Sequence, residues 1–93
     1  MIKGFRDKDT ERIWNREQSK KCSAEIQRTA LRKLVAVDGA EALQDLRIPP
    51  GNRLEKLSGS RHGQMSIRIN DQWRICFTWT KEGPADVEIV DYH

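Results

Sequence analysis

Apolar and polar residues alternate in three runs within residues 64–93, and this pattern constrains the fold more than any other feature. Alternation at a period of two is typical of strands with one buried face. The apolar positions are Met65, Ile67 and Ile69 in the first run, Trp73, Ile75, Phe77 and Trp79 in the second, and Val87 and Ile89 in the third. Because short polar stretches separate the runs, they predict an antiparallel sheet with one face on the core.

The same pattern predicts the register of the first hairpin, because paired residues point to the same side of a sheet. Pairing Ile69 with Trp73 and Ile67 with Ile75 keeps the apolar side chains together. This register leaves residues 70–72 as a three-residue loop.

Arg68 and Arg74 face each other on the polar side in this register. Like charges in directly opposite positions destabilise a hairpin by up to ~1 kcal/mol. A carboxylate or another anion between them would offset that cost, and phosphate best matches the planar fork of arginine. Two interpretations stay open: two solvated arginines that splay apart, or a prepared anion site.

Residues 1–63 supply the remaining elements. The pattern predicts a short strand at residues 2–5, then a helix of about two turns from caps at residues 7–10 to Glu17, and a longer helix from Ala24 to about Val37 capped by Ser23. A capping box at residues 38–41 begins a short turn with Leu43 and Leu46. A non-helical link at residues 47–52, a strand at residues 53–57 and a loop at residues 58–63 follow. The longer helix has its apolar face at Ile26, Ala30, Leu31, Leu34 and Val35. Helices before an antiparallel sheet predict a two-layer α+β domain whose helices cover one face. The face with Arg68 and Arg74 then stays open.

Length and composition fit one domain, residues 1–93, with a modest core. Apolar residues make up 37% and charged residues 33%, so we expect a thin core and a highly charged surface. No apolar run approaches the roughly 20 residues of a membrane span, and residues 1–5 do not lead into a signal peptide. Cys22 and Cys76 are too few for a disulfide scaffold or a zinc site. We therefore expect free thiols in a reducing cytosol, with no metal and no cofactor.

The charge is unevenly distributed along the chain. Residues 1–37 carry ten Lys/Arg against five Asp/Glu, a net charge of +5, whereas residues 64–93 carry three against five, a net charge of −2. A basic first third is typical of contact with nucleic acid or an acidic partner. The alternative is that these charges only solvate helix faces.

The chain ends on Asp91, Tyr92 and His93, which bring a carboxylate, a phenol and an imidazole close to the predicted arginine pair. This set suits metal-free RNA cleavage, in which a 2′-hydroxyl loses a proton, a phosphorane is stabilised and a 5′-oxygen gains a proton. Strict alternation places Asp91 and His93 on the side opposite Tyr92, so a twist or bulge is needed before all three can face Arg74. His62, in a loop flanked by glycines, is expected to be an exposed bystander.

The chain resembles the HigB toxins of the RelE/ParE superfamily of bacterial toxin–antitoxin systems. The resemblance lies in residues 70–77 with the terminal Asp91-Tyr92-His93, the opening residues 1–5, the Pro-Pro-Gly-Asn-Arg-Leu segment at residues 49–54, the turn at residues 57–59 and residues 66–70. The proline-rich segment is similar to that of a GraT-like subgroup. The resemblance implies a compact RelE-like microbial RNase fold, with an N-terminal strand and two helices on one face of an antiparallel sheet.

The resemblance also implies a function. Such a toxin is a ribosome-dependent endoribonuclease of the bacterial cytoplasm that cuts messenger RNA in the A site, with no metal. A HigA-type helix-turn-helix antitoxin restrains it, and the toxin reaches operator DNA only through that antitoxin. No membrane is involved. The basic helices would contact ribosomal RNA.

By position, the resemblance makes Arg74 the group that stabilises the phosphate. The other catalytic candidates are Asp91, Tyr92, His93 and Glu55, and the candidates for RNA backbone contacts are Arg53, Lys56, Arg61 and Arg68. Relatives often carry a histidine where this chain has Glu55, and a lysine near Ser58. A carboxylate can act as a base but offers no positive charge to a phosphate, so we expect slower cleavage than in relatives with the histidine.

Other functions and simpler roles stay open from the sequence. A ParE-like toxin that poisons gyrase by binding, or a catalytically inactive partner of another protein, would need no acid–base tail. The aromatic residues Trp73, Phe77 and Trp79 fit core packing better than base stacking. Tyr92 could cap the sheet edge, and Glu55 could be an ion-pair partner of a neighbouring cation.

Overall fold

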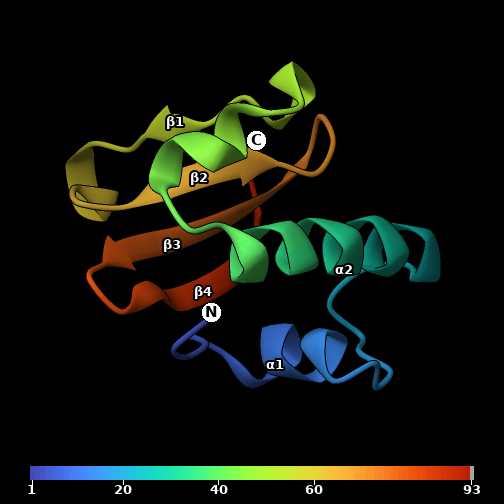
Figure 1. The fold of residues 1–93 in the computed structure, drawn as a ribbon. Helices are drawn as coiled ribbons and strands as arrows, with labels where there is room; N and C mark the ends of the chain where they lie inside the picture. Colours follow the sequence, from blue (N-terminus) through green and yellow to red (C-terminus); the bar gives the residue numbers. More distant parts are fainter. Residues whose placement is uncertain (93) are drawn as a thin grey trace.

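Four strands form one antiparallel sheet in the computed structural model, which describes residues 1–92 and leaves His93 outside the described part. The strands β1 (Glu55–Lys56), β2 (Met65–Arg68), β3 (Trp73–Thr80) and β4 (Gly83–Asp91) lie side by side in chain order (Figure 1). Two helices, α1 (Lys8–Trp14) and α2 (Ala24–Gly39), pack on one side of this sheet, α1 against β4 and α2 against β3 and β4. The predicted two-layer α+β architecture is therefore confirmed.

The core fills the space between the helices and the sheet. Its buried members are Ile13 of α1, Ala30, Leu34 and Val37 of α2, Leu46, and Ile67, Ile69, Ile75, Phe77, Val87 and Ile89 of the sheet and its first hairpin. Ser23 caps α2 as predicted, because its Oγ accepts a hydrogen bond from the Ile26 amide at 3.3 Å. Val35, predicted on the apolar face of α2, is 48% exposed, so the buried stripe is narrower than the pattern indicated. Within residues 1–92 no helix has the length and apolar character needed to cross a membrane.

The predicted register of the β2–β3 hairpin is confirmed. Ile67 pairs with Ile75, and Arg68 pairs with Arg74. Asn70 builds the loop, because its Oδ1 accepts hydrogen bonds from the backbone amides of residues 72 and 73 at 2.8 and 2.7 Å. An Asn side chain that bonds the backbone two residues ahead stabilises this kind of tight turn.

The β3–β4 pairing contains a bulge that the alternation pattern did not predict. Two residues of β4, Asp86 and Val87, face Phe77 alone, and Asp86 has a left-handed φ of 51°. If the register of the hairpin turn continued unbroken, Glu88 would pair with Ile75 on the core face. The extra residue pairs Glu88 with Cys76 instead, so its carboxylate lies on the polar face.

Two predicted elements near the N-terminus are shorter than expected. Residues 2–5 do not form a strand; Phe5 makes a single parallel bridge to Val87, with hydrogen bonds from Arg6 N to Val87 O at 3.0 Å and from Val87 N to Gly4 O at 3.1 Å. The first helix ends at Trp14 rather than Glu17, because the backbone turns left-handed at Arg16 with φ of 62°.

The connection between α2 and β1 also differs from the prediction. Residues 38 and 39 still belong to α2, so they do not cap the next turn. Asp45 does so, because its Oδ2 accepts hydrogen bonds from the amides of Glu41 and Ala42, both at 3.0 Å. The prediction that residues 47–52 are entirely non-helical is wrong for Pro50–Asn52, which form one 3₁₀ turn. Proline is well suited to the first position of such a turn, because its fixed φ is already helical.

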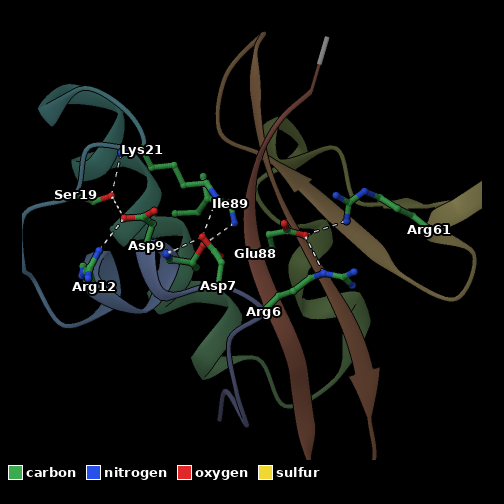
Figure 2. A network of polar contacts seen from close by, with 10 residues as sticks. Arg6, Asp7, Asp9, Arg12, Ser19, Lys21, Arg61, Glu88 and Ile89 are labelled. Carbon is green, nitrogen blue, oxygen red and sulfur yellow. Dashed lines mark hydrogen bonds and ion pairs between the residues drawn. The ribbon is translucent and has the colours of Figure 1, made fainter.

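A polar cluster attaches α1 to the rest of the chain (Figure 2). Asp7 caps the helix by accepting hydrogen bonds at Oδ2 from Thr10 N at 3.3 Å and from Lys21 Nζ at 2.9 Å. Burial raises the pKa of Asp7, but the hydrogen bonds and positive charge of Lys21 and the bonds from Thr10 outweigh burial and hold this pKa below its usual value. Thr10 is fully buried, and its Oγ1 accepts a hydrogen bond from the Ile89 amide of β4 at 3.0 Å.

We expect Thr10→Val to lower the free energy of unfolding by about 1–3 kcal/mol, because valine keeps the shape but leaves the buried Ile89 amide without an acceptor. Urea denaturation measures the change. Thr29→Val in α2 is the matched control, because the Thr29 hydroxyl makes no hydrogen bond within residues 1–92. Equal effects of the two substitutions would contradict this role for Thr10.

Candidate functional site

The face of the sheet that points away from the helices carries an ordered set of polar side chains. One row across the four strands consists of Glu55, Ser66, Cys76 and Glu88. The next row consists of Arg68, Arg74 and Val90. The carboxylates therefore lie on the two outer strands, and an arginine lies in the middle of the sheet.

Arg74 is held on one edge of its guanidinium group. Its Nε donates to Ser66 Oγ at 2.8 Å, and its Nη2 donates to the carbonyl oxygens of Arg53 at 2.7 Å and Ser66 at 3.4 Å. Nη2 also lies 3.2 Å from Glu55 Oε1. No hydrogen bond within residues 1–92 engages Nη1, so the contacts fix the side chain through Nε and Nη2.

The predicted open face needs one correction. Arg74 is only 8% exposed, although the helices lie on the other side of the sheet. Neighbours on its own face bury it: β2, the backbone of Arg53 and the Tyr92 ring, whose centroid lies 5.8 Å from Arg74 Cζ. A cation that is buried needs such partners, because an unpaired charge away from water is strongly unfavourable.

The two facing arginines are each compensated by a carboxylate of their own. Arg68 forms an ion pair with Asp71 in the hairpin loop, and Arg74 forms one with Glu55 of β1. Of the two interpretations left open by the sequence, neither splayed solvated arginines nor a shared anion describes the pair. Separate ion pairs offset part of the repulsion that the register would otherwise cause.

Tyr92 follows the last residue of β4 and continues its direction. Its amide donates to Gln72 O at 2.6 Å, and its ring lies on the same side as Arg74. Asp91 pairs with Trp73 in the ladder and so alternates away from Arg74, and its Oδ2 accepts a hydrogen bond from Gln72 Nε2 at 3.2 Å. The bulge lies before Glu88 and does not change this alternation. Of the terminal tripeptide, the described residues therefore bring Tyr92, but not Asp91, directly to Arg74.

The loop before β1 positions the Arg53 carbonyl. Arg53 has a left-handed φ of 46°, directly after the turn Pro50–Asn52. Asn52 is fully buried and donates from Nδ2 to the carbonyls of Leu46 at 3.2 Å and Ile48 at 3.3 Å, while its Oδ1 accepts a hydrogen bond from Lys33 of α2. Burial, with the charges of Arg32 and Arg68, lowers the pKa of Lys33. Sequence reasoning missed Asn52, and a lone Asn in a proline-rich turn gives no signal of this role.

The remaining candidates do not all gather at Arg74. Lys56 follows Glu55 in β1 and therefore alternates to the helix side of the sheet. The side chain of Arg53 is exposed, and only its carbonyl contacts Arg74. Arg61 reaches across the polar face to β4, where its Nη1 lies 3.1 Å from Glu88 Oε1.

Arg61 also borders a shallow hollow beside Tyr92. This hollow, about 360 Å³, is lined by Arg61, Val90, Asp91 and Tyr92.

Both cysteines are free, and burial raises the pKa of the Cys76 thiol beneath Arg61 and Glu88. Within residues 1–92 no three His, Cys, Asp or Glu side chains gather as a metal-binding group. The arrangement can hold a phosphodiester against the Arg74 guanidinium, with the Glu55 carboxylate and the Tyr92 phenol next to that group.

We expect Ser66→Ala to loosen Arg74, because Nε–H then loses its acceptor in a buried position. The free energy of unfolding should fall by about 1.5–3 kcal/mol, the range for hydrogen bonds to charged groups. In ¹⁵N NMR spectra of the arginine side chains, the Arg74 Nε proton should exchange with water faster. Ser58→Ala, at an exposed serine whose side chain makes no capping hydrogen bond, is the control. An Nε proton that stays protected in Ser66→Ala would contradict the assignment.

Comparisons with known proteins give the family of the chain. The family model described as RelE-like toxin of type II toxin-antitoxin system HigB matches residues 3–93. Toxin HigB-1 of Vibrio cholerae serotype O1 is 40% identical over 94 residues, which cover 100% of this chain and 98% of the relative. An uncharacterized protein of Haemophilus influenzae is 34% identical over 59 residues, which cover 63% of this chain and 58% of the relative.

The fold also has a solved counterpart. The YoeB-YefM complex from Staphylococcus aureus contains a chain that superposes with a TM-score of 0.62 at 22% identity, covering 100% of this chain and 95% of that one. At this identity the likeness shows the fold alone. The family match over nearly the whole length and the 40% identical relative show that the chain belongs to the HigB-like family of RelE-like toxins from type II toxin–antitoxin systems.

Proposed function

We propose that this toxin is a ribosome-dependent endoribonuclease that cuts messenger RNA in the A site, and that Arg74 is the centre of its cleavage site. One observation carries the proposal: a guanidinium fixed through Nε and Nη2 on the polar face, with a carboxylate at 3.2 Å and a phenol ring at 5.8 Å. A rigid cation next to groups that exchange protons is what phosphodiester cleavage without a metal requires.

In the proposed reaction the 2′-hydroxyl of one nucleotide attacks the adjacent phosphorus. A general base takes the hydroxyl proton, the bond from phosphorus to the 5′-oxygen breaks, and a general acid protonates that oxygen. The products are a 2′,3′-cyclic phosphate and a 5′-hydroxyl end. Arg74 stabilises the charge that develops on the phosphorane oxygens, because a fixed donor costs no reorganisation during the reaction.

The proton-transfer groups follow from what lies near Arg74. Glu55 is half-exposed beside the guanidinium, which suits a base that must reach the 2′-hydroxyl. Tyr92 shares the face of Arg74 and can act on the leaving 5′-oxygen. Asp91 and His93, at the end of the chain, remain candidates for the general acid; His93 lies outside the described residues.

The charge distribution supports the ribosome as the partner. The net charge of +5 over residues 1–37 places an excess of cations in the segment that contains α1 and most of α2. These helices cover the face opposite Arg74, so they can contact ribosomal RNA while the polar face holds the messenger. The exposed side chains of Arg53 and Lys56 can add contacts to the RNA backbone.

A HigA-type antitoxin is the proposed partner that restrains the toxin. Membership of a type II toxin–antitoxin family supports a protein antitoxin, and the fold neighbour was solved as a YoeB-YefM complex. In this proposal the toxin acts in the bacterial cytoplasm, where translating ribosomes are found, and meets operator DNA only through the helix-turn-helix antitoxin.

We expect Arg74→Ala to abolish cleavage of messenger RNA on purified ribosomes, and Arg74→Lys to slow it at least about 10-fold, because lysine keeps the charge but loses the planar fork. Primer extension on a ribosome-bound message measures cleavage, and circular dichroism checks the fold. Arg47→Ala, at an exposed arginine in the 3₁₀ turn Leu43–Arg47, should cleave normally. Toxicity that persists in Arg74→Ala and is accompanied by DNA damage would favour a gyrase-binding toxin instead.

We expect Glu55→His to speed ribosome-dependent cleavage, because a histidine is a better base near neutral pH and adds no negative charge beside the phosphate. Glu55→Gln separates the two effects, since it removes the charge without supplying a base, and should slow cleavage. Single-turnover rates on programmed ribosomes measure both variants. A rate for Glu55→His equal to or below that of the wild type would count against Glu55 as the base.

A further inference from the structure

A second charged cluster lies on the polar face of the sheet, beyond the groups assigned to cleavage. Glu88 of β4 lies between two arginines: its Oε1 is 3.1 Å from Arg61 Nη1 and 3.9 Å from Arg6 Nε (Figure 2). Arg61 Nη1 also donates to Gln64 Oε1 at 3.0 Å. Figure 2 shows this cluster on the opposite side of β4 from the Asp7 and Asp9 network.

The three residues come from separate segments. Arg6 belongs to the stretch beside the outer edge of β4, where its amide bonds Val87 O. Arg61 ends the 3₁₀ turn Gly59–Arg61 between β1 and β2. Glu88 reaches this face only because of the bulge before it. Three irregular features therefore converge on one carboxylate.

Glu88 lies next to the position on the polar face that pairs with Arg74. Arg74 pairs with Val90, and Glu88 is the previous residue of β4 on the same face. Same-face residues of a strand are about 7 Å apart. This backbone separation is on the order of the spacing between neighbouring phosphates of an extended single strand, so an RNA with one phosphate at Arg74 can extend its next phosphate toward this cluster.

Two hollows make this path accessible. One of about 380 Å³ is lined by Arg6, Ser60, Arg61, His62, Gln64, Thr78 and Asp86. The hollow beside Tyr92 shares Arg61 with it. Arg61 lines both hollows, and the lining of the first is mostly polar, which fits a sugar and phosphate rather than an apolar ligand.

The charges favour an anionic ligand. Two guanidinium groups around one carboxylate leave an excess of one positive charge, and the side chain of Arg6 is 60% exposed. A phosphodiester carries one negative charge, as a carboxylate does, and offers two oxygens that match arginine forks. Asp86 on the rim of the hollow carries a negative charge that opposes anion binding, but its side chain is exposed, so water screens this charge.

We propose that Arg6 and Arg61 form a second phosphate subsite for single-stranded RNA, and that Glu88 occupies it in the free protein until an RNA phosphate replaces the carboxylate. The inference rests on the proposed RNA-cleaving function and adds a subsite to it. Glu88 thus competes with RNA for the two arginines and weakens the binding of an RNA whose only bound phosphate is the one at Arg74. An RNA that reaches both Arg74 and the second subsite displaces the Glu88 carboxylate.

The experiment measures binding of a fluorescent, non-cleavable 2′-O-methyl hexanucleotide by anisotropy across a salt series. Glu88→Gln should tighten binding about two- to five-fold, the range for a partly exposed charge pair. Arg6→Ala, at an exposed site that does not endanger folding, should weaken binding and reduce the slope of log K against log salt by about 0.7, the value for one lost phosphate contact on a single strand. In the double variant the gain from Glu88→Gln should be smaller, because only Arg61 then remains to bind the phosphate.

Glu82→Gln, an identical charge change in the exposed β3–β4 turn, is the matched control and should leave the salt slope unchanged. The proposal is overturned if Glu88→Gln binds RNA no better than Glu82→Gln, or if Arg6→Ala leaves the gain from Glu88→Gln undiminished. Tighter binding of a polyglutamate peptide without tighter RNA binding would assign the subsite to an acidic protein segment. Because this assay needs no ribosome, a failed subsite with intact cleavage is distinguishable from a failed nuclease.

Discussion

The hydrogen bonds that hold the Arg74 guanidinium are the interaction on which the polar face depends. A cation in the middle of a sheet is tolerated only with partners around it, and here they come from β2, from the loop before β1 and from the residue after β4. The buried Asn52 fixes the loop that places the Arg53 carbonyl at the guanidinium group, and the short strand β1 places the Glu55 carboxylate there. The site is therefore built by irregular segments on a regular sheet.

The two-layer arrangement divides the chemistry between the faces. Both helices cover one face and supply the core, so the opposite face needs no apolar cover and can carry charge. The bulge at Asp86 then gives Glu88 to the polar face while Val87 and Ile89 stay in the core. Thr10 ties the same strand to α1, so the position of β4 is fixed from the helix side.

Local pattern predicted the regular part of this structure. The register that pairs Arg68 with Arg74 followed from the apolar alternation, and α2 followed from Ser23 and its helical spacing. The Arg53 carbonyl, Asn52 and the Arg6–Glu88–Arg61 cluster could not be predicted, because each depends on loops that meet only after folding. The missing strand at residues 2–5 has a related cause: a single bridge forms there, and alternation cannot tell one bridge from a full ladder.

In the proposed mechanism the Arg74 guanidinium binds the scissile phosphate on the polar face of the sheet. A crystal structure of the protein with a short RNA whose cleavage site carries a 2′-deoxy nucleotide tests this most directly. We expect a phosphate oxygen about 3 Å from an Arg74 nitrogen, the distance of a charge-assisted hydrogen bond. RNA phosphates bound only along α1 and α2, with Arg74 contacted by protein groups alone, would contradict it.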